Sequence, residues 1–515
     1  MNTFWITPKG GGEQVLSPVR GGLSLAQHLY LAGAFSSRPL CSGAGRCGLC
    51  QVRFISDAPV PLPMELLRIS SERLERGWRL SCVRQPEPGS SVEAALTTPT
   101  LLPETLPGGC PKGCLGIDLG TTSIHWRFES DSRALSGSFH NPQLGAGSEV
   151  MSRLALAAHP DGAARLRQAA AQAVYTILKD AGCIPESICL AGNTCMTFLA
   201  LGLDVSGLAA APYRVDWAGD AVATLDEVLP QVYIPPLLAP FVGGDISAGL
   251  AALEFSDRKP TPPYLLADLG TNGEFALALP DGRFLLASVP MGPALEGVGM
   301  RRGMLAGPGA AVAYALSPRG LEPVLFAADA SGASVKGISG TGYLSLLARL
   351  ITLGVVSQSG RFERGAASPL AARVLAGLGE QDGEPCLDVG GAALFASDVE
   401  ALLKVKAAFG AAVTILLAEA GLAFSDLHAV LLAGSLGEHV SSPDLEVLGF
   451  LPPGGAGKVQ AVGNSSLDGA CLAAGSQDVR RWLGGLAARA QLVDIVAVPD
   501  FQTMYLDSMR FSHVR

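Results

Sequence analysis

Residues 115–123 read Leu-Gly-Ile-Asp-Leu-Gly-Thr-Thr-Ser, and residues 266–274 read Leu-Ala-Asp-Leu-Gly-Thr-Asn-Gly-Glu. In each stretch an apolar strand ends at an aspartate, Asp118 or Asp268, and a turn rich in glycine and polar side chains follows. Backbone N–H groups in such a turn can surround a phosphate tail, and the carboxylate can hold Mg²⁺ or orient an attacking water. One copy is weak evidence, but two copies about 150 residues apart indicate an internal duplication.

Contacts to a nucleotide are expected from these two loops. The expected phosphate contacts are Gly120, Thr121, Thr122, Gly270, Thr271 and Asn272. Another apolar strand, at 429–433, precedes a glycine-rich turn that contains Gly434, Ser435 and Gly437. A further glycine-rich turn, at 337–342, opens a predicted helix and is either a hinge of the nucleotide domain or ordinary helix-entry chemistry.

Asp245 follows a Gly-Gly pair and has two interpretations of equal weight. It is either a third acidic group of the catalytic site, beside Asp118 and Asp268, or the N-cap of a helix over 246–253.

Short apolar strands alternate with helical patterns throughout the region that contains the loops. Strands are expected at 115–119, 187–191, 264–269 and 429–433, and amphipathic helices at 165–181 and 398–420. This alternation predicts an α/β fold. Together with the duplication, it predicts that residues 115–515 form two α/β halves around a nucleotide cleft.

Four cysteines lie in one short-spaced pattern near the N-terminus. Residues 41–50 read Cys-Ser-Gly-Ala-Gly-Arg-Cys-Gly-Leu-Cys, and Cys82 follows. Four thiolates, two on each iron, suit a [2Fe-2S] cluster, and structural zinc is the alternative. Zinc sites usually show two close cysteine pairs, whereas Cys82 stands alone, so the pattern favours a [2Fe-2S] cluster on Cys41, Cys47, Cys50 and Cys82. The glycines of this loop allow positive φ values, so that N–H groups can face sulfur.

The cysteines belong to a small α+β domain at residues 1–95. In that domain β-prone segments at 2–7 and 50–55 surround a predicted helix at 24–32. A Pro/Gly-rich linker is expected at 96–114. Cys110 and Cys114 are either extra redox thiols or ligands next to the cluster or, more simply, exposed linker thiols. The remaining cysteines stand in apolar surroundings and are expected in cores; they are Cys183, Cys189, Cys195, Cys386 and Cys471.

Composition narrows the class of protein. The chain has 515 residues, of which 48% are hydrophobic and 16% charged, and its net charge is −9. Such a chain can bury large cores, and its acidity argues against general nucleic-acid binding. No apolar run is expected to reach the roughly 18 residues of a membrane span, and no secretory leader is evident. We therefore expect a cytoplasmic protein that does not enter a membrane, where a cysteine cluster indicates metal binding before disulfides.

The motifs resemble known families. The C-x5-C-x2-C spacing is similar to that of adrenodoxin-like ferredoxins, which implies a β-grasp-like domain at 1–95. The paired Asp-Leu-Gly-Thr loops resemble those of the actin-like superfamily, in which two duplicated halves bind ATP and Mg²⁺ between them. A third motif of that superfamily lies on the adenosine side, and the strand and turn at 431–438 resemble it, which implies nucleotide contacts from Gly434, Ser435 and Gly437. The combination resembles the reductive activators of corrinoid proteins, and further matching pieces are 191–194, 241–245, 291–297, 337–342, 434–437, 462–464 and 500–505.

That resemblance implies an ATP-dependent iron–sulfur activase. It would return an inactive Co(II) corrinoid protein or methyltransferase to Co(I) with one electron from the [2Fe-2S] cluster, which an upstream low-potential donor reduces. Asp118 and Asp268 would be the carboxylates that hold the metal and orient water. The sequence identifies neither the corrinoid partner, nor the donor, nor the oligomeric state, and a homodimer is one assembly that it allows.

Two departures from the family pattern stand out. The middle domain of many members is expected to be missing, with only the 96–114 linker in its place, and Ser339 stands where the family often has cysteine. Three other functions compete with the activase. They are a nucleotide-binding redox sensor without ATP turnover, an activator ATPase of a radical dehydratase, and a sugar kinase, which is disfavoured because a fused cluster has no role in phosphorylating an alcohol.

Overall fold

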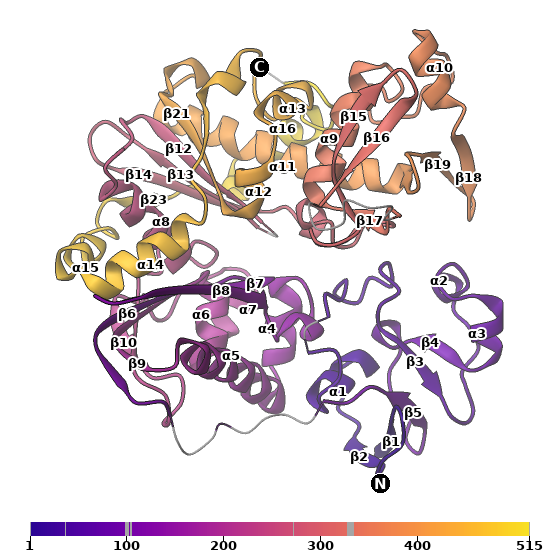
Figure 1. The fold of residues 1–515 in the computed structure, drawn as a ribbon, viewed down its shortest axis with the longest axis horizontal. Coiled ribbons are helices and arrows are strands. Elements are labelled where there is room, and N and C mark those ends of the chain that lie inside the picture. The colour runs from indigo at the N-terminus through magenta and orange to yellow at the C-terminus, as the bar shows by residue number, and fades with distance from the viewer. Residues whose placement is uncertain are drawn as a thin grey trace. The chain divides into compact units, whose positions relative to one another are not determined.

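The structure is a computed structural model that describes residues 2–36, 38–97, 102, 106–270, 272–326 and 334–513. The chain divides into two compact units. Unit 1 comprises Met1–Phe255 and Ser466–Leu486, and unit 2 comprises Ser256–Ser465 and Ala487–Arg515. Figure 1 labels the helices and strands of both units.

Unit 1 begins with the predicted small α+β domain. Its five strands are ordered β2-β1-β5-β3-β4, with β1 and β5 parallel and the other neighbours antiparallel. The bounds are β1 Thr3–Pro8, β2 Val15–Pro18, α1 Leu25–Leu31, β3 Gln51–Phe54, α2 Pro63–Leu66, α3 Ser71–Glu75, β4 Trp78–Leu80 and β5 Ser91–Ala94. The helix predicted at 24–32 is confirmed as α1, since Ser24 and Gln27 form a capping box at its start. Its buried face packs on the sheet through Leu25 and Leu29.

The rest of unit 1 is built on a six-stranded sheet ordered β10-β11-β9-β6-β7-β8. Its strands are β6 Gly109–Leu119, β7 Ser123–Glu129, β8 Ala134–His140, β9 Ile184–Ala191, β10 Ala221–Ala223 and β11 Val232–Ile234. Its helices are α4 Val150–Ala157, α5 Pro160–Ala181, α6 Thr194–Leu201, α7 Ser206–Ala209, α8 Gly244–Glu254, α14 Ser465–Gly475 and α15 Gln477–Gly484. The strand β6 starts at Gly109 and includes residues 109–114 of the expected linker, because residues 109–110 and 114 pair with β9.

Unit 2 repeats this topology. Its sheet is ordered β22-β21-β12-β13-β14-β23, and its strands are β12 Tyr264–Leu269, β13 Asn272–Ala278, β14 Phe284–Pro290, β21 Ala429–Ala433, β22 Val459–Ala461 and β23 Ala490–Leu492. In both sheets the aspartate-ending strand has an antiparallel meander on one side and a parallel strand on the other. The predicted duplication is therefore confirmed at the level of topology.

Two small sheets and several helices complete unit 2. The sheets contain β15 Ala310–Ser317, β16 Gly320–Leu325 and β17 Gly337–Ile338, and then β18 Leu378–Gln381, β19 Glu384–Asp388 and β20 Ala393–Phe395. The helices are α9 Gly340–Thr352, α10 Pro369–Leu375, α11 Ala396–Ala420, α12 Gly434–His439, α13 Ser442–Val447 and α16 Phe501–Asp507. The helices predicted at 165–181 and 398–420 are confirmed as α5 and α11. The predicted amphipathic pattern is confirmed only for α5, because α11 is apolar around most of its circumference.

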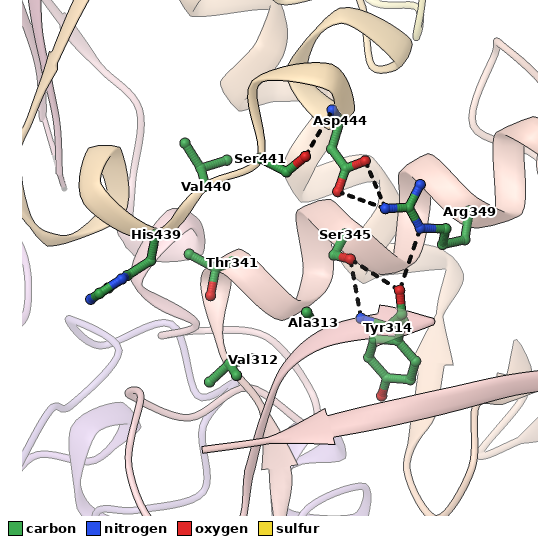
Figure 2. A pocket seen from close by; sticks show the side chains of 10 residues that line it. All are labelled: Val312, Ala313, Tyr314, Thr341, Ser345, Arg349, His439, Val440, Ser441 and Asp444. Atoms are coloured by element: carbon green, nitrogen blue, oxygen red, sulfur yellow. Dashed lines mark hydrogen bonds and ion pairs between the residues drawn. The ribbon is translucent and has the colours of Figure 1, made fainter. Parts of the chain in front are cut away.

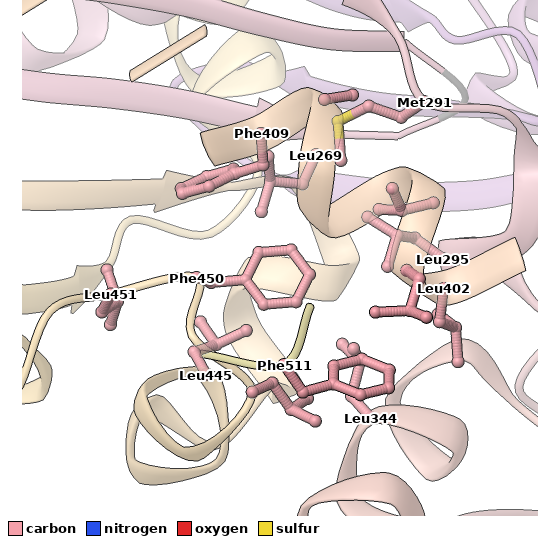
Figure 3. Packing of buried hydrophobic residues seen from close by; sticks show 14 of the residues in the cluster. Leu269, Met291, Leu295, Leu344, Leu402, Phe409, Leu445, Phe450, Leu451 and Phe511 are labelled. Atoms are coloured by element: carbon pink, nitrogen blue, oxygen red, sulfur yellow. The ribbon is translucent and has the colours of Figure 1, made fainter. Parts of the chain in front are cut away.

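Helix α11 corrects the expectation that no apolar stretch reaches the length of a membrane span. Among the described residues it is the one helix long and apolar enough to do so, and 72% of its most apolar 18-residue window is buried. It packs in the core of unit 2, where Phe409 meets the rings of Phe275 and Phe450 edge to face. Figure 3 shows Phe409 and Phe450 among the buried residues of this core. The buried Lys406 ammonium donates to the carbonyl oxygens of Ser508 and Ser512. Burial in a protein core accounts for its composition.

Candidate functional site

Asp118 stands half-buried at the end of β6, where the sequence predicted a phosphate loop. Its neighbour on β9 is Ala191, and its neighbour on β7 is His125. The Ser466 hydroxyl, from the start of α14, donates to Asp118 Oδ1 at 2.9 Å. A serine from 348 residues further along the chain therefore helps to orient this carboxylate.

The backbone carbonyls of the first loop are held from inside unit 1. The Asn141 side chain donates to Gly120 O at 2.8 Å, and its backbone N–H donates to Thr122 O at 2.9 Å. The guanidinium of the buried Arg153 donates to Thr121 O at 2.6 Å. In a trans peptide the N–H is opposite the C=O. The N–H groups of Thr121 and Thr122 therefore face away from Asn141 and Arg153, as phosphate binding requires.

Asn193 is a loop contact that the sequence analysis did not single out. It is the N-cap of α6, where its side chain accepts from the Met196 N–H at 2.9 Å. Its Nδ2 also donates to Thr121 Oγ1 at 3.0 Å. The strand pairing in the two sheets indicates why Asn193 lies at the first loop. Ala191 is the neighbour of Asp118, as Ala433 is of Asp268, so residues 192–193 correspond to the turn at 434–435.

In unit 2, Asp268 ends β12 beside Ala433 and faces the buried Glu274 across the turn. The turn is closed by the Gly270 N–H, which donates to Asn272 O at 3.0 Å. Thr271, a predicted phosphate contact, lies outside the described residues. The structure thus places Gly270 and Asn272 on either side of the predicted loop.

The third predicted turn lies directly against Asp268. Gly434 has a φ of 77°, and a side chain there would put its Cβ 2.9 Å from Asp268 Oδ1. Gly437 has a different surrounding, since a Cβ there would come within 2.7 Å of the Leu432 backbone. Gly437 therefore permits close packing of α12 on β21, while Gly434 makes room beside the carboxylate. The side chain of Ser435 is outside the described part of the structure.

A pocket of about 140 Å³ lies in unit 2 between the first turns of α9 and the connection from α12 to α13 (Figure 2). At one end, the guanidinium of Arg349 pairs with the buried Asp444 carboxylate at 3.0 Å. Burial raises the pKa of Asp444, and Arg349 opposes that rise. The lining residues are Val312, Ala313, Tyr314, Thr341, Ser345, Arg349, His439, Val440, Ser441 and Asp444. Thr341 belongs to the glycine-rich turn at 337–342, and His439 ends the helix α12 that begins at the turn at 434–437.

Asp245 is not the N-cap of its helix. That position is Gly243, whose Cα lies so close to residues 193 and 194 that a Cβ would come within 2.4 Å of the Thr194 N atom. Asp245 stands in the first turn of α8, and its backbone N–H donates to Gly192 O at 3.3 Å. The N-cap interpretation is therefore wrong. The backbone of Asp245 is next to the Gly192 turn, which places it near the first loop of unit 1.

The four predicted cluster cysteines lie close to one another. Hydrogen bonds from Cys47 and then Cys82 lower the pKa of Cys41, and a hydrogen bond from Cys82 lowers the pKa of Cys50. No group of three or more His, Cys, Asp or Glu side chains in the described residues is placed to hold one metal ion. Cys82 is linked to both Cys41 and Cys50, so all four side chains gather at one place. Four thiolates are the donor set that a [2Fe-2S] cluster needs, so the residues present fit that cluster.

The loop around these cysteines also suits a cluster. Gly43, Gly45 and Gly48 all have positive φ values, 89°, 65° and 67°, as the sequence predicted. The N–H groups of Arg46 and Cys47 donate to Cys41 Sγ at 3.3 and 3.5 Å. Such N–H···S bonds stabilise negative charge on sulfur.

A buried ion pair holds the segment that carries Cys82. The Glu65 carboxylate pairs with Arg84 and accepts from the Leu80 N–H at 2.8 Å. Burial raises the pKa of Glu65. The hydrogen bond from Arg84 is the largest of several interactions that lower this pKa, and their net effect is a lowered pKa. Sequence reasoning missed this pair, because Glu65 and Arg84 are 19 residues apart and neither stands in a motif.

The other cysteines are only partly as predicted. Cys183, Cys189 and Cys195 are buried, whereas Cys386 and Cys471 are half-buried. Cys110 and Cys114 lie half-buried in β6, so the interpretation of exposed linker thiols is wrong. Burial also raises the pKa of the Cys114 thiol, which makes it a poor nucleophile.

Two family models match parts of this chain. Residues 263–515 match the family model described as the C-terminal domain of RACo, the ASKHA domain, and residues 114–258 match the model of the RACo middle region. The expectation that the middle part is missing is therefore wrong. The prediction took the middle region for an insertion in the linker, but the match covers the six-stranded sheet of unit 1 from Cys114 onward and helices α4 to α8.

Named relatives cover different parts of the chain. The corrinoid activation enzyme RamQ of Eubacterium limosum is 27% identical over 77% of this chain and 70% of its own length. The [Co(II) methylated amine-specific corrinoid protein] reductase of Methanosarcina barkeri is 30% identical, over 46% of this chain and 43% of its own. One component of the Na(+)-translocating NADH-quinone reductase of Chlamydia pneumoniae is 33% identical over 81 residues, which are 16% of this chain and 19% of its own length.

A solved structure shares the fold of the whole chain. It is a reductive activator for a corrinoid, iron-sulfur protein, with a TM-score of 0.67, 22% identity, and coverage of 100% of this chain and 99% of the other. Three findings lead to one conclusion. Two family models together span most of the chain, the names of two relatives describe action on corrinoid proteins, and a solved structure of a corrinoid-protein activator has the same fold. The chain belongs to the family of reductive activators of corrinoid proteins.

Proposed function

We propose that this protein uses ATP to drive the one-electron reduction of an inactive Co(II) corrinoid protein to the Co(I) state. The electron comes from an upstream low-potential donor and passes through a [2Fe-2S] cluster on Cys41, Cys47, Cys50 and Cys82. The proposal is supported by the occurrence, in one chain of this family, of four neighbouring cysteines and two matching Asp-Leu-Gly-Thr loops. The bound cluster would supply one-electron storage, which matches the stoichiometry of the cobalt reduction.

The chain's own residues have assigned parts in this proposal. Thr121 and Thr122 offer N–H groups to phosphate, while Asp118 and Asp268 hold Mg²⁺ and orient the attacking water. Asn272 lies in the second phosphate-binding loop. Asp245 is assigned a supporting acidic role near the first loop, because its backbone is fixed at the Gly192 turn.

The nucleoside is assigned to the turn at Gly434 and the adjoining pocket. Thr341, Ser345 and Ser441 give that pocket hydroxyl groups, and the Arg349–Asp444 pair gives it fixed charges. Groups that donate and groups that accept hydrogen bonds together suit the edge of a purine base.

The reducing conditions that the four thiolates and the Co(I) product require favour a cytoplasmic location.

The proposal is tested by mixing reduced protein, Mg²⁺-ATP and a Co(II) corrinoid protein without oxygen and following the cobalt absorption spectrum. Formation of Co(I) is expected with ATP and is not expected with a non-hydrolysable analogue. Asp118→Ala and Asp268→Ala should lose ATP hydrolysis and Co(I) formation together. Hydrolysis-deficient variants that still reactivate the partner would instead support a nucleotide-binding regulator without turnover. Failure to form Co(I) with corrinoid proteins from several methyl-transfer systems would overturn the proposal.

A further inference from the structure

A buried segment of unit 1 joins the cysteine loop to the first phosphate loop. It comprises residues 141–149, between β8 and α4, and we call it the bridging segment. It contains no strand and only one short 3₁₀ turn at Leu144–Ala146. Its polar residues are nevertheless almost fully buried: Asn141, Gln143 and Ser148 are at most 1% exposed. A loop of this composition is normally on the surface, so its burial requires specific partners.

Five hydrogen bonds join the bridging segment to the small N-terminal domain. The Gly145 N–H donates to Ser36 O at 3.3 Å, and the Ser148 N–H donates to Leu40 O at 3.0 Å. The Glu149 N–H donates to Ser42 Oγ at 3.2 Å, and the hydroxyl of the buried Tyr30 donates to Pro142 O at 3.2 Å. The hydroxyl groups of Ser42 and Ser148 bond each other at 3.4 Å. Leu40 and Ser42 are the immediate neighbours of Cys41, so three of these bonds end on the cysteine loop itself.

The same segment is bonded to the phosphate loop. Asn141 donates to the carbonyls of both Gly120 and Thr122. Arg153 makes the second connection, because its Nε donates to Gly147 O at 2.9 Å while its other arm donates to Thr121 O at 2.6 Å. One planar guanidinium therefore fixes the bridging segment and the phosphate loop relative to each other.

Close packing makes these connections stiff. A Cβ at Gly145 would come within 2.3 Å of Phe35 O in the small domain, and one at Gly147 within 2.5 Å of Ser152 Cβ. Closely packed interiors transmit displacement instead of absorbing it. A shift of the Thr121 peptide on phosphate binding would therefore move Arg153, then Gly147, and then the N–H groups at 148 and 149 that contact the cysteine loop.

We infer that the bridging segment couples nucleotide binding at Gly120–Thr122 to the redox state of the cluster at Cys41, with Arg153 as the positioning residue. The inference rests on the proposed function, since it assumes both a nucleotide at this loop and a cluster on these cysteines. Coupling between two binding equilibria is reciprocal. Nucleotide must change the reduction potential of the cluster, and reduction must change the nucleotide affinity by the same free energy.

The test measures both sides of this linkage in the cluster-containing protein. Calorimetry gives the Kd of a non-hydrolysable ATP analogue for the oxidised and for the reduced protein, and a spectroelectrochemical titration gives the midpoint potential with and without the analogue. We expect about a tenfold difference in Kd, within the usual range of allosteric coupling. For one electron, that factor corresponds to a shift of about 59 mV.

Arg153→Lys keeps the positive charge but loses the planar fork. The Kd ratio should fall toward one in this variant, and the potential should no longer respond to the analogue. Arg167→Lys is the matched control, because Arg167 also donates to a backbone carbonyl of unit 1, Leu225 O at 2.8 Å, but does not contact the bridging segment through that bond. It should retain the full tenfold ratio.

Ser42→Ala tests the other end of the bridging segment, in case the Arg153 variant does not fold. It removes the acceptor for the Glu149 N–H and does not touch the phosphate loop. A reduced Kd ratio is expected. In wild-type protein, hydrogen exchange at the amides of 148 and 149 should slow when the analogue binds.

The possible results separate the inference from the proposed function. If the analogue binds and ATP is hydrolysed, but Kd is equal in both redox states, the inference fails and the proposed function stands. An undiminished ratio in both Arg153→Lys and Ser42→Ala would also overturn the inference. If wild-type protein binds no nucleotide in either redox state, the proposed function itself fails.

Discussion

The two halves share a sheet topology but hold their loops and helices in different ways. The first loop has its carbonyls bound by Asn141 and Arg153, and its aspartate receives a bond from Ser466. In the second loop, the turn is closed by its own backbone, and Asp268 faces the buried Glu274. The repeated element is therefore the strand and turn, while the support around each turn is particular to its half.

The long helices that precede β9 and β21 differ in a related way. Helix α5 has the amphipathic pattern of a helix at a surface, whereas α11 is apolar around most of its circumference and buries Lys406. The core of the second half therefore encloses its long helix more completely than the first half does.

Four predictions test how far the two halves are equivalent. They are given in decreasing order of the change that each should produce.

Asp118→Asn and Asp268→Asn compare the two loops directly. Each change removes a carboxylate proposed to hold Mg²⁺ or orient water, so each should lower the rate of ATP hydrolysis by about 10²–10⁴-fold. Phosphate release under saturating ATP measures the effect. A variant with an undiminished rate would show that its loop repeats the fold without taking part in hydrolysis.

Lys406→Met tests the enclosed helix of the second half. Burial lowers the pKa of Lys406 from 10.5 to about 8, so between these values the unfolded chain binds more protons than the folded one. The wild-type free energy of unfolding should therefore rise relative to the variant from about pH 8 to about 10.5, by no more than roughly 3 kcal/mol. Urea unfolding of both proteins across this range measures the difference. Parallel pH curves would contradict the prediction.

Asn141→Ala removes support that is specific to the first loop. The Gly120 carbonyl loses its side-chain donor, and the free energy of unfolding should fall by about 1–3 kcal/mol. Nucleotide affinity should fall as well, since the loop is no longer fixed. Gln231→Ala, at an exposed position in the same unit, is a control that should change neither quantity. Normal stability of the Asn141 variant would argue against the proposed support.

Gly434→Ala and Gly192→Ala compare the turns beside the two aspartates. At 434 the new methyl group would press on Asp268 Oδ1, and the positive φ adds a strain of about 1–2 kcal/mol. At 192 it would meet the Leu119 backbone at 2.9 Å instead. Hydrolysis should therefore suffer more than stability in the first variant, and stability more than hydrolysis in the second. Rate assays and thermal unfolding of both variants separate these outcomes.

Features that depend on residues close together in the sequence could be predicted from the sequence alone. Strands that end in Asp-Leu-Gly-Thr, the capping serine of α1 and the glycines of the cysteine loop act within a few positions, so local patterns predicted them. The repeat of the first pattern then predicted the duplicated fold, because two copies require two similar sheets.

Features that depend on distant contacts were missed. The segment 141–149 has the glycine, proline and polar residues of a surface loop, and only its partners in the small domain and at the phosphate loop explain its burial. Arg153 shows no motif, and its role follows from bonds to residues 6 and 32 positions away. The assignment of Cys110 and Cys114 to a linker failed for the same reason, since β6 extends to pair with the remote β9.

The return of residues 466–486 to unit 1 has a consequence for synthesis of the chain. Gly116 on β6 lies so close to Cys471 that a Cβ would come within 2.5 Å of its sulfur, and Asp118 accepts its bond from Ser466. A ribosome that has made residue 255 must add about 215 more before Cys471 exists, which takes on the order of tens of seconds. The unit that emerges first is therefore completed only after most of unit 2 has been made, and until then its central strand has an open flank that a chaperone could occupy.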